Sequence, residues 1–73
     1  MKKKFNRDNA TPNTLRVIEE LDNALADCSG APGHIVNQII LSVLDGAQRE
    51  KRLKGLERLA ALDYLEDVHG YTS

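Results

Sequence analysis

Apolar residues recur at helical spacing along most of the chain, and the first such run predicts a helix over residues 12–28. Thr11 is a favourable N-cap and Pro12 fits the first helical position. Beyond them, the apolar positions share an arc of about 120° on a helical wheel; they are Val17, Ile18, Leu21, Ala24, Leu25 and Cys28. Gly30 and Pro32 then supply a stop signal.

The second run, over residues 34–46, carries a wider apolar surface. Its apolar positions span about 180° of a wheel, and Leu41 lies on the opposite side. One short helix with a narrower stripe does not cover that surface. We therefore expect this segment to form the centre of a homodimer, intertwined or side by side, with a dimer core of Ile35, Val36, Ile39, Ile40, Leu41, Val43 and Leu44.

The third run, over residues 47–68, has a leucine at every third position from Leu53 to Leu65. Each step of three falls short of a full turn, so the row winds through about 240°. Either the helix breaks near Ala60-Ala61, or its leucines meet different neighbours. The second alternative is favoured because alanine is a good helix former. Leu53 and Leu56 are then expected to pack on the hairpin of the first two helices, and the later leucines on a second subunit or a target.

The predicted fold class is all-α, a helical hairpin plus a C-terminal helix. We expect residues 1–10 to form a mobile basic arm, residues 11–70 a single helical domain, and residues 71–73 a short tail. Continuity of the second and third helices through Gly46 stays open, because a glycine inside a helix costs only about 1 kcal/mol. A lone core in 73 residues supplies only about 3–5 kcal/mol, which also favours a dimer.

Composition excludes several classes of protein. A single cysteine, Cys28, excludes a disulfide framework. The longest apolar run, residues 39–44, is interrupted by a serine and is far shorter than the roughly 20 residues of a membrane span. Polar residues 6–13 stand where a signal peptide would be apolar. We expect a cytoplasmic protein that does not enter the membrane.

Catalytic, metal and cofactor signatures are missing from the sequence, so we do not expect an enzyme. Cys28 and His34 are six residues apart across the turn, but a thiol on an apolar helix face is usually buried and inert. The acids Asp63, Glu66 and Asp67 are interpreted as a solvated face, because nothing completes a metal shell. We expect no catalytic residues, no metal and no cofactor.

Charge is segregated along the chain. Residues 46–58 carry five bases and two acids, a balance of +3, and residues 59–73 carry three acids and no base. The leading hypothesis is a non-enzymatic protein-binding module that inhibits or modulates a larger protein, as small phage or plasmid accessory proteins do. Its expected contact residues are Arg49, Arg52, Arg58, Leu62, Tyr64, Leu65 and Val68.

The alternative hypothesis is a small dimeric regulator that binds DNA or RNA. Thr14-Leu15-Arg16-Val17, followed by Glu19-Glu20-Leu21, a glycine turn and the isoleucines of the second run, resembles the ribbon-helix-helix repressors, which read the major groove with a two-stranded ribbon. The resemblance implies base contacts by Thr14 and Arg16. Phosphate contacts would come from Lys2, Lys3, Lys4, Lys51 and Lys54. Thr11-Pro12 favours a helix over the same residues, and a structural subunit with larger oligomers is a third alternative.

Overall fold

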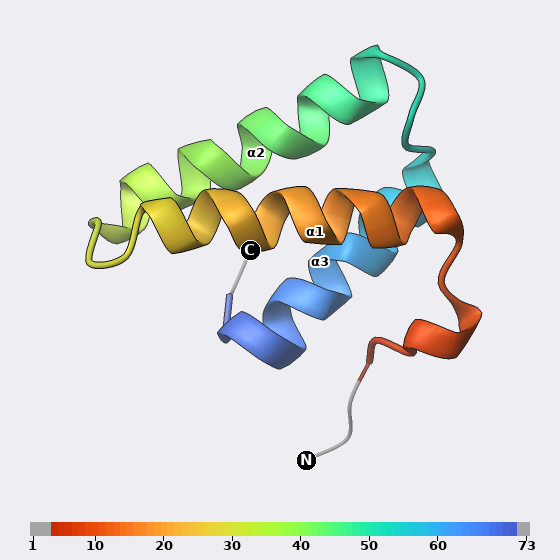
Figure 1. Cartoon of the computed structure of the whole chain (residues 1–73), viewed down its shortest axis with the longest axis horizontal. Helices are drawn as coiled ribbons and strands as arrows, with labels where there is room; N and C mark the ends of the chain where they lie inside the picture. The colour runs from red at the N-terminus through yellow and green to blue at the C-terminus, as the bar shows by residue number, and fades with distance from the viewer. Residues whose placement is uncertain (1–3, 72–73) are drawn as a thin grey trace.

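Three α-helices make up the fold of the described residues 4–71, in agreement with the predicted all-α class (Figure 1). The computed structural model describes residues 4–71. It contains a short 3-10 turn, η1 (Arg7–Asn9), followed by α1 (Pro12–Asp27), α2 (Gly33–Arg49) and α3 (Gly55–His69), and no strand in this part of the chain. No helix within it has both the length and the apolar character needed to cross a bilayer.

Helix α1 begins and ends where the sequence predicts. The Thr11 hydroxyl accepts a hydrogen bond from the Thr14 N–H at 3.2 Å, and Pro12 occupies the first helical position. At the other end Cys28 is the C-cap, and Gly30 adopts a left-handed conformation with φ 87°. The turn that follows reverses the chain, so α2 runs back alongside α1.

Helix α2 continues through Gly46, which corrects the predicted boundary between residues 46 and 47. It ends three residues later in a Schellman motif, in which the Arg52 N–H bonds the Ala47 carbonyl at 2.8 Å and the Lys51 N–H bonds the Gln48 carbonyl at 3.0 Å. Lys51 takes the left-handed position, φ 61°, that glycine usually occupies. Burial of Leu44 and Ala47 on either side of Gly46 offsets the modest cost of a glycine within the helix.

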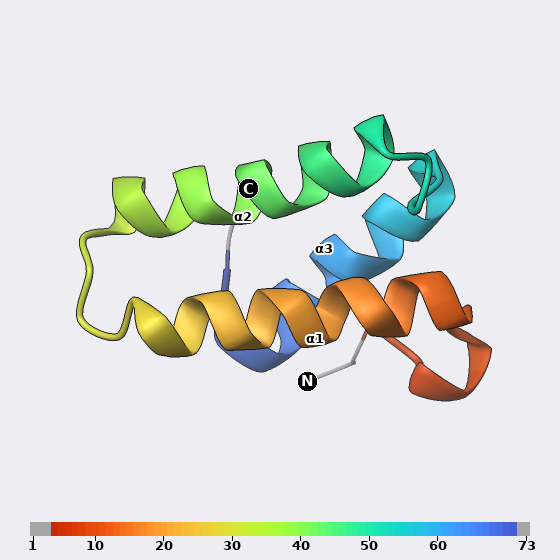
Figure 2. The same cartoon turned by 45° about the horizontal axis from the view of Figure 1, so that its top comes forward.

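Helix α1 packs against both other helices, whereas α2 and α3 diverge from the 50–54 loop that joins them (Figure 2). The core lies where α1 meets its two neighbours. It consists of Val17, Ile18, Leu21, Ile40, Leu44, Ala47, Leu53, Ala61, Tyr64 and Leu65. Side-chain bonds link α2 to the C-terminal part of the chain at two places: Arg58 pairs with Asp45, and the Tyr71 hydroxyl donates to the Asn37 side chain.

The segment before α1 is docked on α3 in the described residues, contrary to the prediction of a mobile arm. The backbone N–H groups of Lys4 and Phe5 donate to the Asp67 carboxylate at 2.7 and 2.6 Å. The Phe5 ring packs edge-on against Tyr64, with ring centroids 5.2 Å apart. The carboxylate and the apolar contact both come from α3, so the arm composition alone did not reveal the docking. Residues 1–3 of the predicted arm lie outside the described residues.

Tyr71, two residues after the end of α3, also differs from its predicted role as the start of a tail. Tyr71 is half-buried and packs against the core, besides its bond to Asn37. Gly70, with φ 67°, ends α3 and turns the chain toward α2. Residues 72 and 73 lie outside the described part of the chain.

Candidate functional site

The start of α1, the end of α2 and the start of α3 lie at one end of the molecule (Figure 1). Four basic residues belong to these helix ends and to the loop between α2 and α3. We call this group the basic end: Arg16, Arg49, Lys51 and Lys54. All four are exposed, and none makes an ion pair with any acid in the part of the chain that the structure describes. The folded chain therefore brings together bases that the sequence separates, with positive charge available to a partner.

A buried carboxylate holds the basic end together. Glu57, in the first turn of α3, accepts hydrogen bonds from the Thr11 hydroxyl and from the Lys54 N–H, the latter at 2.8 Å. These bonds join the start of α1 to the start of α3. The Thr11 bond first, and then the Lys54 backbone bond, hold the pKa of the Glu57 carboxyl below its usual value.

Two of the arginines predicted to contact a partner act within the chain instead. Arg52 bridges Glu20 at 3.0 Å and Glu50 at 2.7 Å. Arg58 lies 2.5 Å from Asp45 and also donates to the Gln48 side chain at 2.6 Å. Both guanidinium groups tie the loop and α3 to the hairpin, so of the three predicted arginines only Arg49 is without an ion pair in residues 4–71.

Among residues 4–71, the most exposed large apolar side chain is Leu56, in the first turn of α3, at 82%. It lies two residues after Lys54 and next to buried Glu57. Leu59 follows at 58%. Sequence reasoning placed Leu56 against the hairpin and missed its exposure, although a signal was present: Leu56 and Leu65 are nine residues apart, which puts them on opposite sides of a helix.

The predicted contact residues at the C-terminal half of α3 divide between core and surface. Leu65 is fully buried and Tyr64 is 7% exposed, so neither offers its side chain to a partner. The Tyr64 hydroxyl donates to Asp22 on α1 at 2.8 Å, and His69 bonds the same carboxylate at 2.9 Å. Burial and the bond to Asp22 raise the pKa of Tyr64. Leu62 is half-buried against the core, and Val68 is 58% exposed.

The winding of the leucine row is thus as predicted, and α3 runs unbroken through Ala60 and Ala61. The neighbours assigned to Leu56 and Leu65 were wrong, whereas Leu53 packs into the core with residues of the hairpin as predicted. Leu53 and Leu65 enter the chain's own core, whereas Leu56 and Leu59 face outward. The reason is the start of α3 at Gly55, which leaves Leu53 in the loop and sets the phase of the others.

The predicted dimer core of α2 is also divided. Ile40 and Leu44 are buried within this chain, and Val36 and Val43 pack partly against its core. Leu41 is 37% exposed. Ile35 and Ile39 are half-buried at the edge of α2. The core of the chain therefore covers more of α2 than was expected.

The residues implied by the ribbon-helix-helix resemblance do not form a ribbon. Residues 14–17 are helical, and Thr14 is 1% exposed beside the Thr11 cap, so Thr14 does not reach a base. Of the predicted phosphate contacts, Lys51 and Lys54 belong to the basic end. Lys4 pairs with Glu66 at 3.0 Å, and Lys2 and Lys3 lie outside the described residues.

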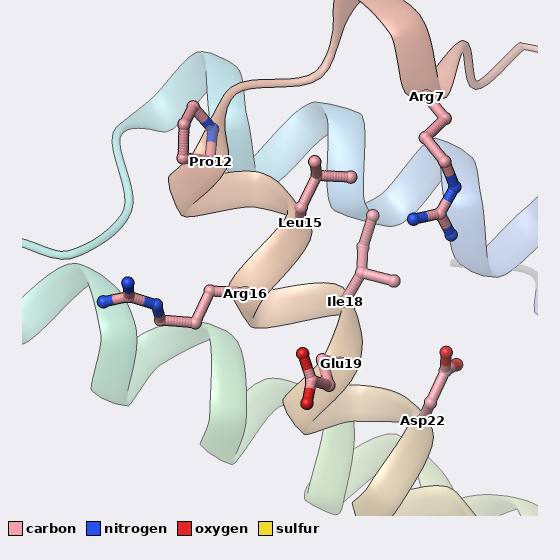
Figure 3. Close-up of a pocket in the computed structure, with 7 residues that line it drawn as sticks. All are labelled: Arg7, Pro12, Leu15, Arg16, Ile18, Glu19 and Asp22. Carbon is pink, nitrogen blue, oxygen red and sulfur yellow. The ribbon is translucent and has the colours of Figure 1, made fainter.

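A broad hollow of about 480 Å³ lies beside α1 (Figure 3). Its lining residues are Arg7, Pro12, Leu15, Arg16, Ile18, Glu19 and Asp22. The lining mixes two bases, two acids and an apolar floor, so its charge selects no ligand class. Elsewhere, Cys28 is half-buried and His34 is exposed. Within residues 4–71, no three His, Cys, Asp or Glu side chains gather as a metal site requires.

Comparison of the chain with protein-family models, with curated proteins and with solved structures finds no match. The functional argument therefore depends on the surface of the chain itself.

Proposed function

We propose that this chain is a non-enzymatic protein-binding module that inhibits or modulates a larger protein, with Leu56 and the basic end as its contact surface. The observation that carries the proposal is the 82% exposure of Leu56 at the end of the molecule where four bases make no ion pair in the described residues. Binding interfaces commonly place an aliphatic or aromatic anchor in a pocket and surround it with a polar rim.

The chemistry of this surface favours an acidic partner. Bases without a partner in the chain raise the rate of encounter with a negatively charged surface. An apolar pocket on that surface then removes Leu56 from water, which stabilises the complex by about 1.5–3 kcal/mol. The loop that presents Lys51 is fixed by the Schellman motif, so little order is lost on binding.

Affinity capture from host cells tests the proposal with two matched variants. Leu56→Ser removes the anchor, and Val68→Ser removes an exposed apolar side chain at the far end of α3. We expect the wild type to retain a protein after nuclease treatment, and we expect salt to weaken this retention. The protein should be lost with Leu56→Ser and still be retained with Val68→Ser. Equal retention by wild type and Leu56→Ser, in the same nuclease-treated extract, contradicts the proposal.

Nucleic-acid binding is the second candidate, and one observation favours it. The N-termini of α1 and α3 lie at the basic end together with the C-terminus of α2, so two positive dipole ends against one negative end add positive potential to the four bases. This candidate predicts that the chain retards DNA or RNA in a gel. The association constant should fall by about one log unit per log unit of salt for each phosphate contacted. Lys51→Gln with Lys54→Gln weakens such binding, and Leu56→Ser leaves it unchanged. Absence of retardation at low salt excludes it.

A further inference from the structure

The segment before α1 rests on the C-terminal half of α3, and its contacts there have a defined chemistry. The backbone N–H groups of Lys4 and Phe5 both donate to Asp67 Oδ2, at 2.7 and 2.6 Å, and the Phe5 ring lies edge-on to Tyr64. The Lys4 ammonium pairs with Glu66 at 3.0 Å. Hydrogen bonds to a carboxylate are stronger than bonds between neutral groups. These side chains of α3 therefore recognise a basic residue followed by an aromatic one.

Most contacts of this segment, residues 4–9, lie at the surface; we call the segment the docked arm. None of the three residues of η1 is buried, Phe5 is half-buried, and Lys4 is exposed. Exposed ion pairs contribute little to stability and are screened by salt. Release of the docked arm is therefore a local opening that needs no unfolding of the three helices.

The aromatic ring beneath the docked arm is held in place by other contacts. The Tyr64 hydroxyl donates to Asp22 on α1 at 2.8 Å, and His69, which bonds the same carboxylate at 2.9 Å, lies edge-on to Tyr64 with ring centroids 5.8 Å apart. Tyr64 therefore keeps its position when the docked arm opens. A preformed aromatic platform of this kind loses little order when a ligand binds to it.

The docked arm does not fill the space beside it. A hollow of about 230 Å³ remains, lined by Phe5, Arg7, Tyr64, Asp67 and Val68, and Val68 is 58% exposed. A larger aromatic side chain in place of Phe5 would fill more of this hollow and remove more of Val68 from water. The arm of a second copy would carry the same phenylalanine and leave the same hollow, so the hollow favours a different polypeptide.

We propose that this part of α3 binds a segment of another protein in which a lysine or arginine precedes an aromatic residue, and that the docked arm is an autoinhibitory contact that such a segment displaces. We call the site the acidic–aromatic site: Tyr64, Glu66, Asp67 and Val68. Residues 59–73 carry three acids and no lysine or arginine, so they attract a basic segment. The acidic–aromatic site does not include Leu56 or the basic end, so the proposal stands independently of the proposed function.

A synthetic peptide with the sequence of residues 1–10 and the change Phe5→Trp is the probe. The chain contains no tryptophan, so the fluorescence of the probe reports its binding to the full chain. We expect saturable binding to the full-length Phe5→Ala variant below about 1 mM. Binding to the wild type should be about tenfold weaker, because the intact arm competes for the site. The unlabelled peptide of residues 1–10 should displace the probe, and the same peptide with Phe5→Ala, which has equal charge, should not.

Two matched double variants locate the binding. Adding Asp67→Ala to Phe5→Ala should abolish saturable binding, whereas adding Asp27→Ala, the same change of charge at an exposed position of α1, should leave the Kd within about twofold. Circular dichroism checks that each variant remains helical.

Four results would overturn the proposal. They are a lack of saturable binding to Phe5→Ala, equal Kd values for Phe5→Ala and the wild type, binding that survives Asp67→Ala, and equal displacement of the probe by the two unlabelled peptides. A wild-type dimer in sedimentation equilibrium that the peptide dissociates also overturns it, because that result assigns the site to the arm of a second copy.

Discussion

Glu57 offers the sharpest test of how the basic end is built. Its carboxylate is 8% exposed and accepts hydrogen bonds from Thr11 and from the Lys54 backbone. Glu57→Gln keeps the shape and one acceptor oxygen but removes the charge that strengthens both bonds. Hydrogen bonds to a charged group contribute about 1.5–3 kcal/mol, against about 1 kcal/mol for neutral ones. We therefore expect Glu57→Gln to lower the free energy of unfolding by about 1–2 kcal/mol.

The contribution of Glu57 to the free energy of unfolding depends on pH, because the pKa of Glu57 is lower in the folded chain than in the unfolded one. Its contribution is therefore complete above the unfolded pKa of about 4.3 and is lost as pH falls through the lower, folded pKa. The difference in stability between wild type and Glu57→Gln should be largest at neutral pH and shrink as the pH falls below about 4.

Urea unfolding followed by circular dichroism measures both effects. In a domain of this size each kcal/mol also lowers Tm by about 4–8 °C, so the change is well resolved. Glu19→Gln, at an exposed position of α1 that makes no ion pair in residues 4–71, is the matched control and should change stability by less than about 0.5 kcal/mol. A Glu57→Gln variant as stable as that control at pH 7, or a difference that does not shrink in acid, would refute the reasoning.

Three further predictions concern stability. Lys51→Gly should raise the free energy of unfolding by about 0.5–1 kcal/mol, because Lys51 sits at φ 61°; a loss measured by urea unfolding would contradict the Schellman geometry. Leu65→Ala should cost about 2–4 kcal/mol and Leu56→Ala less than about 0.5 kcal/mol in the same assay, and equal losses would contradict the placement of α3. The pKa of Tyr64 is raised in the folded chain, so its contribution is complete below the unfolded pKa of about 10 and is lost at higher pH. Tyr64→Phe should therefore lose less stability than wild type between pH 9 and 12, roughly the range in which tyrosines titrate. If wild type and Tyr64→Phe lose the same stability at alkaline pH, the titration of a buried Tyr64 bonded to Asp22 is not the cause of that loss.

Local signals in the sequence were sufficient to predict where α1 lies. Thr11, Pro12 and Gly30 each act through their own backbone and cap geometry, which needs no other part of the chain. The boundary between α2 and α3 was not predictable in this way. Gly46 carries the stronger local stop signal, but the helix ends where Lys51 accepts a left-handed conformation and Leu53 reaches the core.

Which side chains of α3 are exposed depends on where the helix begins, and the sequence left that boundary open. Moving the start of the helix to Gly55 leaves Leu53 in the loop, and packing against α1 then selects Leu65 for the core and leaves Leu56 outside. The docked Lys4–Phe5 segment depended in the same way on tertiary structure, since Asp67 and Tyr64 are 62 and 59 residues away along the chain. Contacts of this kind become predictable only once the helices are placed relative to one another.

Site-specific photo-crosslinking in host cells tests the proposed function most directly. A photoreactive amino acid at position 56 probes the proposed anchor, and the same amino acid at position 19 probes an exposed site of α1 away from it. The account predicts that irradiation joins a larger protein to the chain through position 56, that position 19 yields no such product, and that Arg49→Glu with Lys51→Glu suppresses the product. Crosslinks to the same protein from both positions, or crosslinks from position 56 to nucleic acid alone, would contradict the account.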